Sequence, residues 1–173
     1  EAVIEKGGSK AAKTTISSDS ASFIVFSNDF DRVLASFVLA NGAAASGKKA
    51  TMFFTFWGLS VLRKKKPGHV KKDIMGRMFS SMMPGGMHAL SLSSMNFGGM
   101  GPVLMKHRMK KKQVDQLESM FAQAKAAGVR MIACQMSMDI MGITAGELIE
   151  GTEIGGVAAY MEAASESGIN LFI

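Results

Sequence analysis

The chain has 173 residues, of which 47% are hydrophobic, and a formal net charge of +6. This apolar content is sufficient for one domain with a continuous core. Its single cysteine excludes an intramolecular disulfide framework, no signal peptide is recognisable, and a reducing cytoplasm is the expected compartment. Residues 1–20 are rich in Lys, Ser, Gly and Thr without apolar periodicity. They predict a flexible tail or linker before a single domain over residues 21–173.

The first elements predict a strand, a helix and a second strand. Residues 22–26 form a short apolar run with β-branched and aromatic side chains, which is typical of a strand. Ser27, Asn28 and Asp29 have helix-capping side chains, residues 30–46 repeat apolar positions at helical spacing, and Gly47 suits a left-handed cap. Residues 50–56 predict a second buried strand, and residues 57–65 a short helix with a basic end. This order favours a parallel sheet with crossover connections.

The middle of the chain interrupts this pattern. No formally charged residue stands between Phe79 and Met105, but Pro84, Gly98 and Pro102 are among several backbone breakers there. A lipid-exposed transmembrane helix would need a more continuous apolar run. Eight methionines lie from Met75 through Met105, and thioether side chains adapt well to irregular surfaces. We expect residues 74–109 to be a Met- and Gly-rich insertion that packs over the sheet or against another subunit.

Regular elements return in the last third of the chain. Residues 113–127 predict a helix that ends at Gly128, residues 129–133 a third strand, and residues 136–141 a short helix. Thr144 and Glu147 have capping-box spacing. Residues 152–154 are a weak strand candidate, Gly155 and Gly156 permit close backbone approach, residues 157–167 predict a helix, and residues 169–173 a terminal strand. Together the elements predict an open, mostly parallel α/β sheet of about five strands with helices on both faces.

Cys134 is the main candidate for chemistry, because it stands directly between the third predicted strand and the helix after it. Backbone N–H groups at the start of a helix favour a thiolate. Ligands of open parallel sheets collect at the carboxyl ends of the strands, so the turns there should bring Asn28, Trp57 and Cys134 into one crevice. A structural role, as a small buried hydrophobic residue, is the alternative. We predict Cys134 as the catalytic residue, with these substrate-binding neighbours: Asn28, Trp57, Gln135, Met136 and Ser137.

Several other chemistries fit the sequence poorly. A single thiol cannot form the intramolecular disulfide of a Cys-x-x-Cys mechanism, and a peroxidase would need a resolving thiol from elsewhere. A cysteine hydrolase would need a nearby histidine, but His69, His88 and His107 carry no family signature. The histidines are also too widely spaced to predict a metal site. The turn after the first strand lacks the glycines of a nucleotide site, so no cofactor is predicted.

The positive charge gathers in two clusters, within residues 63–72 and residues 106–112. Such clusters attract anionic substrates, acidic partners or an anionic membrane surface, or are simply solvated. They have no interleaved aromatic residues and match no nucleic-acid-binding motif, so nucleic acid is not an expected partner.

The chain resembles the DsrE/DsrF-like family, specifically the DsrE-like branch that is often labelled peroxiredoxin-family or peroxide reductase. The most specific segments are residues 51–59 (TMFFTFWGL), 82–85 (MMPG) and 133–142 (ACQMSMDIMG), with support from residues 41–44 and 153–158. The resemblance implies a flavodoxin-like fold, a homo-oligomer and sulfur transfer, in which a cysteine carries sulfane sulfur as a persulfide or thiosulfonate. It implies TusA-like or rhodanese-like sulfur carriers, or small sulfane donors, as partners.

On this chain the acceptor that the resemblance implies is Cys134, because there is no second cysteine for a two-thiol relay. Our first hypothesis is therefore a cytoplasmic sulfurtransferase-like carrier. The first rival is a non-enzymatic module, oligomeric or in peripheral contact with a membrane surface, in which Cys134 is merely buried. The second rival is a thiol peroxidase that depends on an external reductant.

Overall fold

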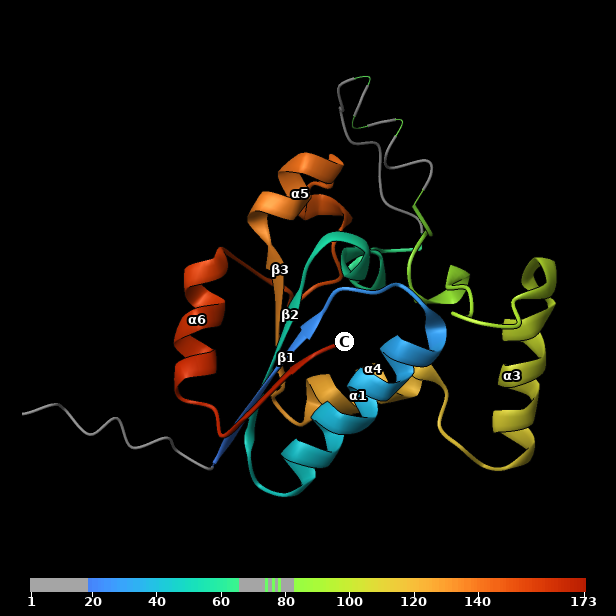
Figure 1. Cartoon of the computed structure of the whole chain (residues 1–173), viewed down its shortest axis with the longest axis horizontal. Helices are drawn as coiled ribbons and strands as arrows, with labels where there is room; N and C mark the ends of the chain where they lie inside the picture. The colour runs from blue at the N-terminus through green and yellow to red at the C-terminus, as the bar shows by residue number, and fades with distance from the viewer. Residues whose placement is uncertain (1–18, 66–73, 75, 77, 79–82) are drawn as a thin grey trace, which may run out of the picture.

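The computed structural model describes residues 19–65, 74, 76, 78 and 83–173, and these residues form a parallel sheet with helices on both faces (Figure 1). Within them the strands are β1 (Ser20–Val25), β2 (Lys49–Phe54), β3 (Arg130–Cys134), β4 (Glu153–Gly155) and β5 (Ile169–Phe172). The described sheet has the order β4-β3-β2-β1-β5, and every neighbouring pair is parallel. The predicted sheet of about five strands is confirmed. Most of the predicted tail, residues 1–18, lies outside the described residues, and Ser20 already belongs to β1.

The helices form two unequal layers. Helices α1 (Phe30–Ala45) and α4 (Leu117–Ala126) cover one face of the sheet, and α6 (Val157–Ser165) covers the other (Figure 1). Phe37 of α1 lies between the layers, with its ring centroid 6.3 Å from that of Phe54 and 5.7 Å from that of Phe121. The main core lies between the sheet and the α1–α4 pair, and a smaller buried cluster lies on the α6 side.

The insertion joins the main core through a few apolar side chains. Met83, Met87, Leu90 and Met109 are each buried against it, so these parts of the insertion pack on the sheet domain. Residues 75, 77 and 79–82 of the expected insertion lie outside the described residues. No helix formed by the described residues is long and apolar enough to cross a membrane.

The insertion also contains a helix that the sequence analysis missed, α3 (Met100–Lys111). Gly99 precedes it with a positive φ of 96°, and Pro102 occupies its first turn. Proline is tolerated there because the first N–H groups of a helix have no intrahelical acceptor. The glycines and the proline therefore mark a helix start rather than an irregular loop.

Two predicted helices differ from those observed. The helix expected over residues 57–65 is a 3-10 helix, η1 (Phe56–Leu62), and Arg63 pairs instead with Leu148 in an antiparallel bridge. The helix expected from residue 113 begins at Leu117, because Gln113 has a φ of +57° and Gln116, the N-cap residue, has an extended backbone. The prediction thus placed the basic residue Arg63 in the first helix and the apolar residue Val114 in the second, and both lie outside those helices.

The predicted helix caps agree with the structure better than these helix boundaries do. Gly47 and Gly128, which follow α1 and α4, both have a φ of +76° as expected. The capping box is confirmed, since the N–H of Thr144 donates to Glu147 Oε1 at 3.0 Å and its hydroxyl donates to the same oxygen at 3.1 Å. Asp29 occupies the N-cap of α1 but makes no side-chain cap bond.

Candidate functional site

The carboxyl edge of the sheet brings together the turns that follow β1, β2 and β3. The N–H of Thr55 donates to Val25 O at 3.1 Å, and the N–H of Gly58 donates to Phe26 O at 2.8 Å. A Cβ at position 58 would lie 2.1 Å from Val25 O, so only glycine permits this approach. The turns after β1 and β2 are therefore in direct backbone contact, and η1 also packs against β3 and α5 (Gln135–Met141).

Cys134 lies where the sequence predicted, as the last residue of β3 and the N-cap residue of α5. It is only 4% exposed and belongs to the small buried cluster on the α6 side of the sheet, together with Phe53, Ile132 and Tyr160. The ring centroids of Phe53 and Tyr160 are 5.4 Å apart. In the isolated chain the thiol is therefore covered.

Gly155, the register partner of Cys134 on β4, keeps this cluster close-packed. A Cβ there would lie 3.0 Å from Ile132 Cγ2 and 3.1 Å from the Cβ of Ala159. At Gly155 the close approach is to side chains, rather than between backbones as expected. At Gly156 an added Cβ would have no neighbour within 4 Å.

The three residues after Cys134 face different surroundings. Ser137 is fully buried, and its hydroxyl shares a hydrogen bond of 2.8 Å with Thr55 Oγ1. This bond ties α5 to the end of β2. Met136 is 56% exposed, and Gln135 is exposed with its Nε2 donating to Asp139 Oδ1 at 2.8 Å.

Asn28 and Trp57 lie in turns at the same edge as Cys134. Asn28 is half-buried and Trp57 is 46% exposed. The structure thus places the turns side by side, while the buried cluster around Cys134 is built from Phe53, Ile132 and Tyr160 rather than Trp57. A shared substrate crevice that includes Asn28 and Trp57 stays a prediction.

A cluster of three phenylalanine rings at this edge of the sheet was not predicted from the sequence. The ring centroid of Phe26 lies 5.6 Å from those of both Phe56 and Phe172. Phe172 is 68% exposed, and Phe56 has a φ of +46°. Left-handed backbone at a non-glycine residue is strained and persists only where its surroundings enforce it. The only sequence signal for this group is the position of each phenylalanine at or just beyond the end of a strand.

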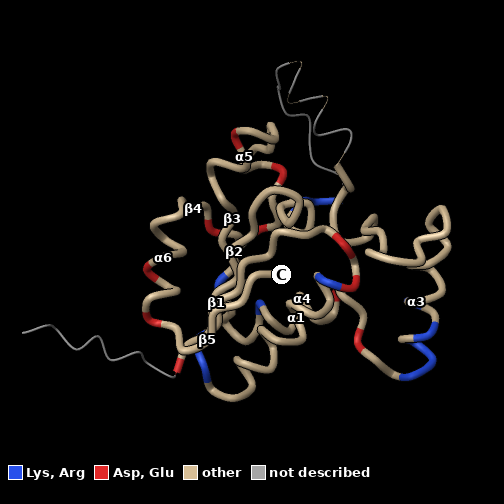
Figure 2. The backbone as a smooth tube through the Cα atoms, in the orientation of Figure 1, with Lys and Arg blue, Asp and Glu red and all other residues tan. Residues whose placement is uncertain are grey.

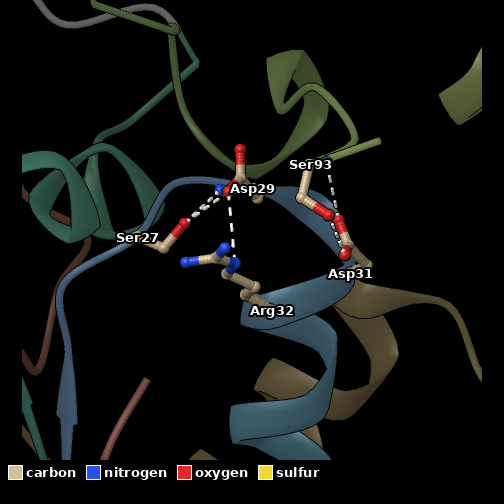
Figure 3. A network of polar contacts seen from close by, with 5 residues as sticks. All are labelled: Ser27, Asp29, Asp31, Arg32 and Ser93. Atoms are coloured by element: carbon tan, nitrogen blue, oxygen red, sulfur yellow. Dashed lines mark hydrogen bonds and ion pairs between the residues drawn. The ribbon is translucent and has the colours of Figure 1, made fainter. Parts of the chain in front are cut away.

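A polar network ties the insertion to the start of α1 (Figure 3). The hydroxyl of Ser27 donates to Asp29 Oδ2 at 2.9 Å, and Arg32 Nε lies 3.4 Å from the same oxygen. From the insertion, the N–H and hydroxyl of Ser93 donate to the two carboxylate oxygens of Asp31, at 2.9 and 2.5 Å. Partial burial acts to raise the pKa of Asp31, but the bonds from Ser93 and the charge of Arg32 outweigh it and hold the pKa below its usual value.

Asp31→Asn should reduce the free energy of unfolding at neutral pH by about 1 kcal/mol, allowing for solvent screening. The folded-state pKa is below the unfolded one, so this stabilisation is present above the unfolded pKa of about 4 and disappears as the pH falls through the folded value. Urea titrations from pH 7 to pH 2 should show the two proteins converging in stability.

Ser93→Ala serves as the control for this network, because it removes the hydroxyl donor and leaves both the backbone N–H donor and the Asp31 carboxylate. The double variant should be less destabilised than the sum of the two single variants. A stability difference between Asp31→Asn and the parent that stays constant down to pH 2 would contradict the assignment.

The two basic clusters are structurally different. Arg63 is 6% exposed and its Nη2 lies 3.1 Å from Oε2 of Glu147, which is 1% exposed. It therefore belongs to a buried ion pair and does not attract an anionic substrate. Lys66, Lys71 and Lys72 lie outside the described residues. The second cluster lies on α3, where Arg108, Lys110 and Lys111 are exposed.

The two described histidines, His88 and His107, both lie in the insertion and not in the cluster around Cys134. His88 Nδ1 lies 2.9 Å from Glu118 Oε1, and His107 is exposed on α3. His69 lies outside the described residues. Within the part of the chain that the structure describes, no group of three or more His, Cys, Asp or Glu side chains is placed to hold a metal ion.

Comparisons with known proteins agree with this architecture. The model of the DsrE/DsrF/DrsH-like family matches residues 17–172. The chain is 44% identical over 150 residues to the uncharacterized protein YrkE of Bacillus subtilis (strain 168), covering 87% of this chain and 94% of that protein. It is 40% identical over 141 residues to the sulfur carrier protein DsrE2 of Allochromatium vinosum, covering 79% of this chain and 87% of that protein.

One solved structure supports the fold. The ychN protein from E. coli superimposes with a TM-score of 0.51 over 90% of this chain and 99% of that chain, at 14% identity. At this identity the match concerns the fold alone. It confirms the flavodoxin-like α/β arrangement that the resemblance implied.

Proposed function

Because the chain belongs to the DsrE/DsrF/DrsH-like family, we propose that it is a sulfur carrier that binds sulfane sulfur on Cys134 and passes it to a partner thiol. The observation that carries this proposal is the position of the chain's only cysteine, at the junction of β3 and α5 on the carboxyl edge of a parallel sheet. The similarity to a protein named as a sulfur carrier supports it.

The proposed chemistry is an exchange between sulfur atoms. The Cys134 thiolate attacks the outer sulfur of a donor persulfide, a new S–S bond forms on Cys134, and the donor S–S bond breaks as its electron pair leaves on the donor thiolate. The persulfide on Cys134 is then attacked at its outer sulfur by the acceptor thiolate, which regenerates the Cys134 thiolate. With tetrathionate as the donor, the thiolate attacks one of the two central sulfurs, the central S–S bond breaks as its electron pair leaves on thiosulfate, and Cys134 holds a thiosulfonate. No net oxidant is needed for either step.

The neighbours of Cys134 have separate roles in this proposal. The backbone N–H groups of Gln135, Met136 and Ser137 stabilise the negative charge on the thiolate and on the sulfur it carries. The bond between Ser137 and Thr55 keeps the start of α5 fixed relative to β2. Asn28 and Trp57, from the adjoining turns, would contact the donor or acceptor.

The proposed partners are TusA-like or rhodanese-like sulfur carriers or small sulfane donors, and we propose a homo-oligomer. Exposed apolar side chains of α6, the helix that carries Tyr160 of the Cys134 cluster, support an interface on this side: Val157 is 69% exposed and Met161 59%. Apolar exposure of this kind can mark an interaction surface.

Intact-mass spectrometry should detect the proposed adduct. After incubation with a persulfidated carrier, polysulfide or tetrathionate, we expect the parent protein to gain one sulfur adduct that reductant removes, and Cys134→Ser to gain none. Because the chain has a single cysteine, this variant is a complete control. A Cys134 that stays unmodified with all three donors would contradict the proposal.

The burial of Cys134 favours the second candidate, an interaction module with a structural cysteine. That module would leave Cys134 unmodified while Cys134→Ser lowers stability. Rapid peroxide consumption without sulfur loading would instead indicate a thiol peroxidase.

A further inference from the structure

Helix α3 carries an exposed surface that is apolar at one end and basic at the other. The helix lies to one side of the sheet and its two helical layers (Figure 1). Residues Met100, Val103 and Leu104 share one helical face by their spacing and are 64%, 67% and 61% exposed. Immediately before the helix, Met95 and Phe97 are 72% and 68% exposed. Exposed apolar groups gathered in this way indicate an interaction surface.

The same helical face becomes basic toward the carboxyl end of α3. Arg108 and Lys111 continue the stripe that begins at Met100, and Lys110 and Lys112 flank it, all four exposed. The helix contains no acidic residue, and Figure 2 shows its Lys and Arg residues gathered at one end. Lys106 is engaged elsewhere, with its Nζ 3.3 Å from His88 O and 5.2 Å from the centroid of the Phe30 ring.

An apolar groove lies beside this helix. It has a volume of about 340 Å³, its wall includes Leu92, Phe97, Leu104 and Met105, and Arg108 is its charged residue. An apolar groove with one cation among its lining residues suits an acyl chain attached to an anionic headgroup. Phe97, Leu104 and Arg108 belong both to this groove and to the exposed surface described above, so the groove and that surface are continuous.

We infer that this α3 surface, made of Met95, Phe97 and the outward residues of α3, docks on an anionic lipid bilayer. Met100 and Lys111 are about 17 Å apart along the helix, at 1.5 Å per residue. An apolar end inserted about 5–10 Å into the interface would place the basic end among the lipid phosphates. A second copy of this surface fits less well, since α3 has no acidic residue to pair with the basic end of another α3.

Vesicle binding tests this inference with the full chain. Cosedimentation with vesicles of phosphatidylglycerol and phosphatidylcholine should show binding that weakens with salt, and vesicles of phosphatidylcholine alone should bind far less. Lys110→Glu with Lys111→Glu should weaken binding by about thirtyfold or more, since each basic residue near the surface contributes about 1 kcal/mol. The charge-matched control is Lys49→Glu with Lys65→Glu, both exposed and outside α3, and it should keep most of the binding.

The apolar end has its own matched pair of variants. Val103→Ser with Leu104→Ser should weaken binding by about tenfold or more. Val38→Ser with Leu39→Ser, at exposed positions of α1, should leave it nearly unchanged. All four positions are exposed, so these variants should fold.

Several results would overturn the inference. These are absence of binding to anionic vesicles, equal binding to neutral vesicles, and binding that survives both α3 variants. Capture of poly-glutamate without vesicle binding would reassign the surface to an acidic protein. A dimer in sedimentation velocity that Val103→Ser with Leu104→Ser dissociates, without vesicle binding, would reassign it to a second copy. None of these results bears on sulfur loading at Cys134, so the two proposals fail separately.

Discussion

Glu147→Gln is expected to lower the free energy of unfolding by about 3–5 kcal/mol, because it removes the carboxylate charge from the buried Arg63–Glu147 ion pair. Nη2 of Arg63 lies 3.1 Å from Oε2 of Glu147, and the two residues are 6% and 1% exposed. Two backbone hydrogen bonds join the same two segments of the chain: the N–H of Lys64 donates to Glu147 O, and the N–H of Ile149 donates to Leu62 O. Chemical denaturation at pH 7 would measure the loss.

Glu153→Gln provides the matched control for the buried pair. Arg130 and Glu153 are 2.8 Å apart but about half exposed, so breaking this pair should change stability by at most about 1 kcal/mol. Replacing both buried charges, with Arg63→Met and Glu147→Gln, should give a protein more stable than Arg63→Met alone. Equal losses for Glu147→Gln and Glu153→Gln would show that burial does not set the strength of the Arg63–Glu147 pair.

Tyr160→Ala should speed the reaction of Cys134 with a thiol reagent by about tenfold or more, because truncation of the side chain removes part of its cover and weakens the packing of α6. Tyr160 is 9% exposed and packs with Phe53 in the cluster that buries Cys134. In the parent protein, the reagent should react slowly, at a rate set by local opening. Stopped-flow labelling with a chromogenic disulfide reagent would measure both rates.

Phe121→Ala separates local opening from general loss of stability. Phe121 is 8% exposed and packs with Phe37 in the main core, on the opposite face of the sheet. Its truncation should lower the free energy of unfolding by about 3–5 kcal/mol, as expected for an aromatic residue, but should change labelling less than Tyr160→Ala. If the two variants label at equal rates at matched stability, the route to Cys134 does not pass under α6.

The sheet was largely predictable from sequence because its strands are short apolar runs bounded by turn and helix-capping residues. Glycines with positive φ end α1 and α4 where predicted, at Gly47 and Gly128. The errors arose where one sequence feature is compatible with two different local structures. Pro102 was taken as a breaker, although proline is tolerated in the first turn of a helix. Arg63 was assigned to a basic helix end, although its partner Glu147 is far away in sequence.

The candidate site was predictable only in part. The position of Cys134 followed from local sequence, since an apolar run before it and a helical run after it define a strand–helix junction. Its burial did not, because Phe53 and Tyr160 reach it from β2 and α6 through tertiary packing. The same holds for the contact of Asp31 with Ser93, which joins α1 to the insertion. Such contacts leave no local pattern in the sequence.

The most direct test of the central proposal follows one sulfur atom through Cys134. The protein is loaded with radiolabelled sulfane sulfur, freed of donor, and mixed with an acceptor thiol. We predict that the label is bound at up to one atom per chain, leaves with the acceptor, and is absent from Cys134→Ser. Label that stays on the protein in the presence of acceptor, or that binds Cys134→Ser as well as the parent, would contradict a carrier role for Cys134.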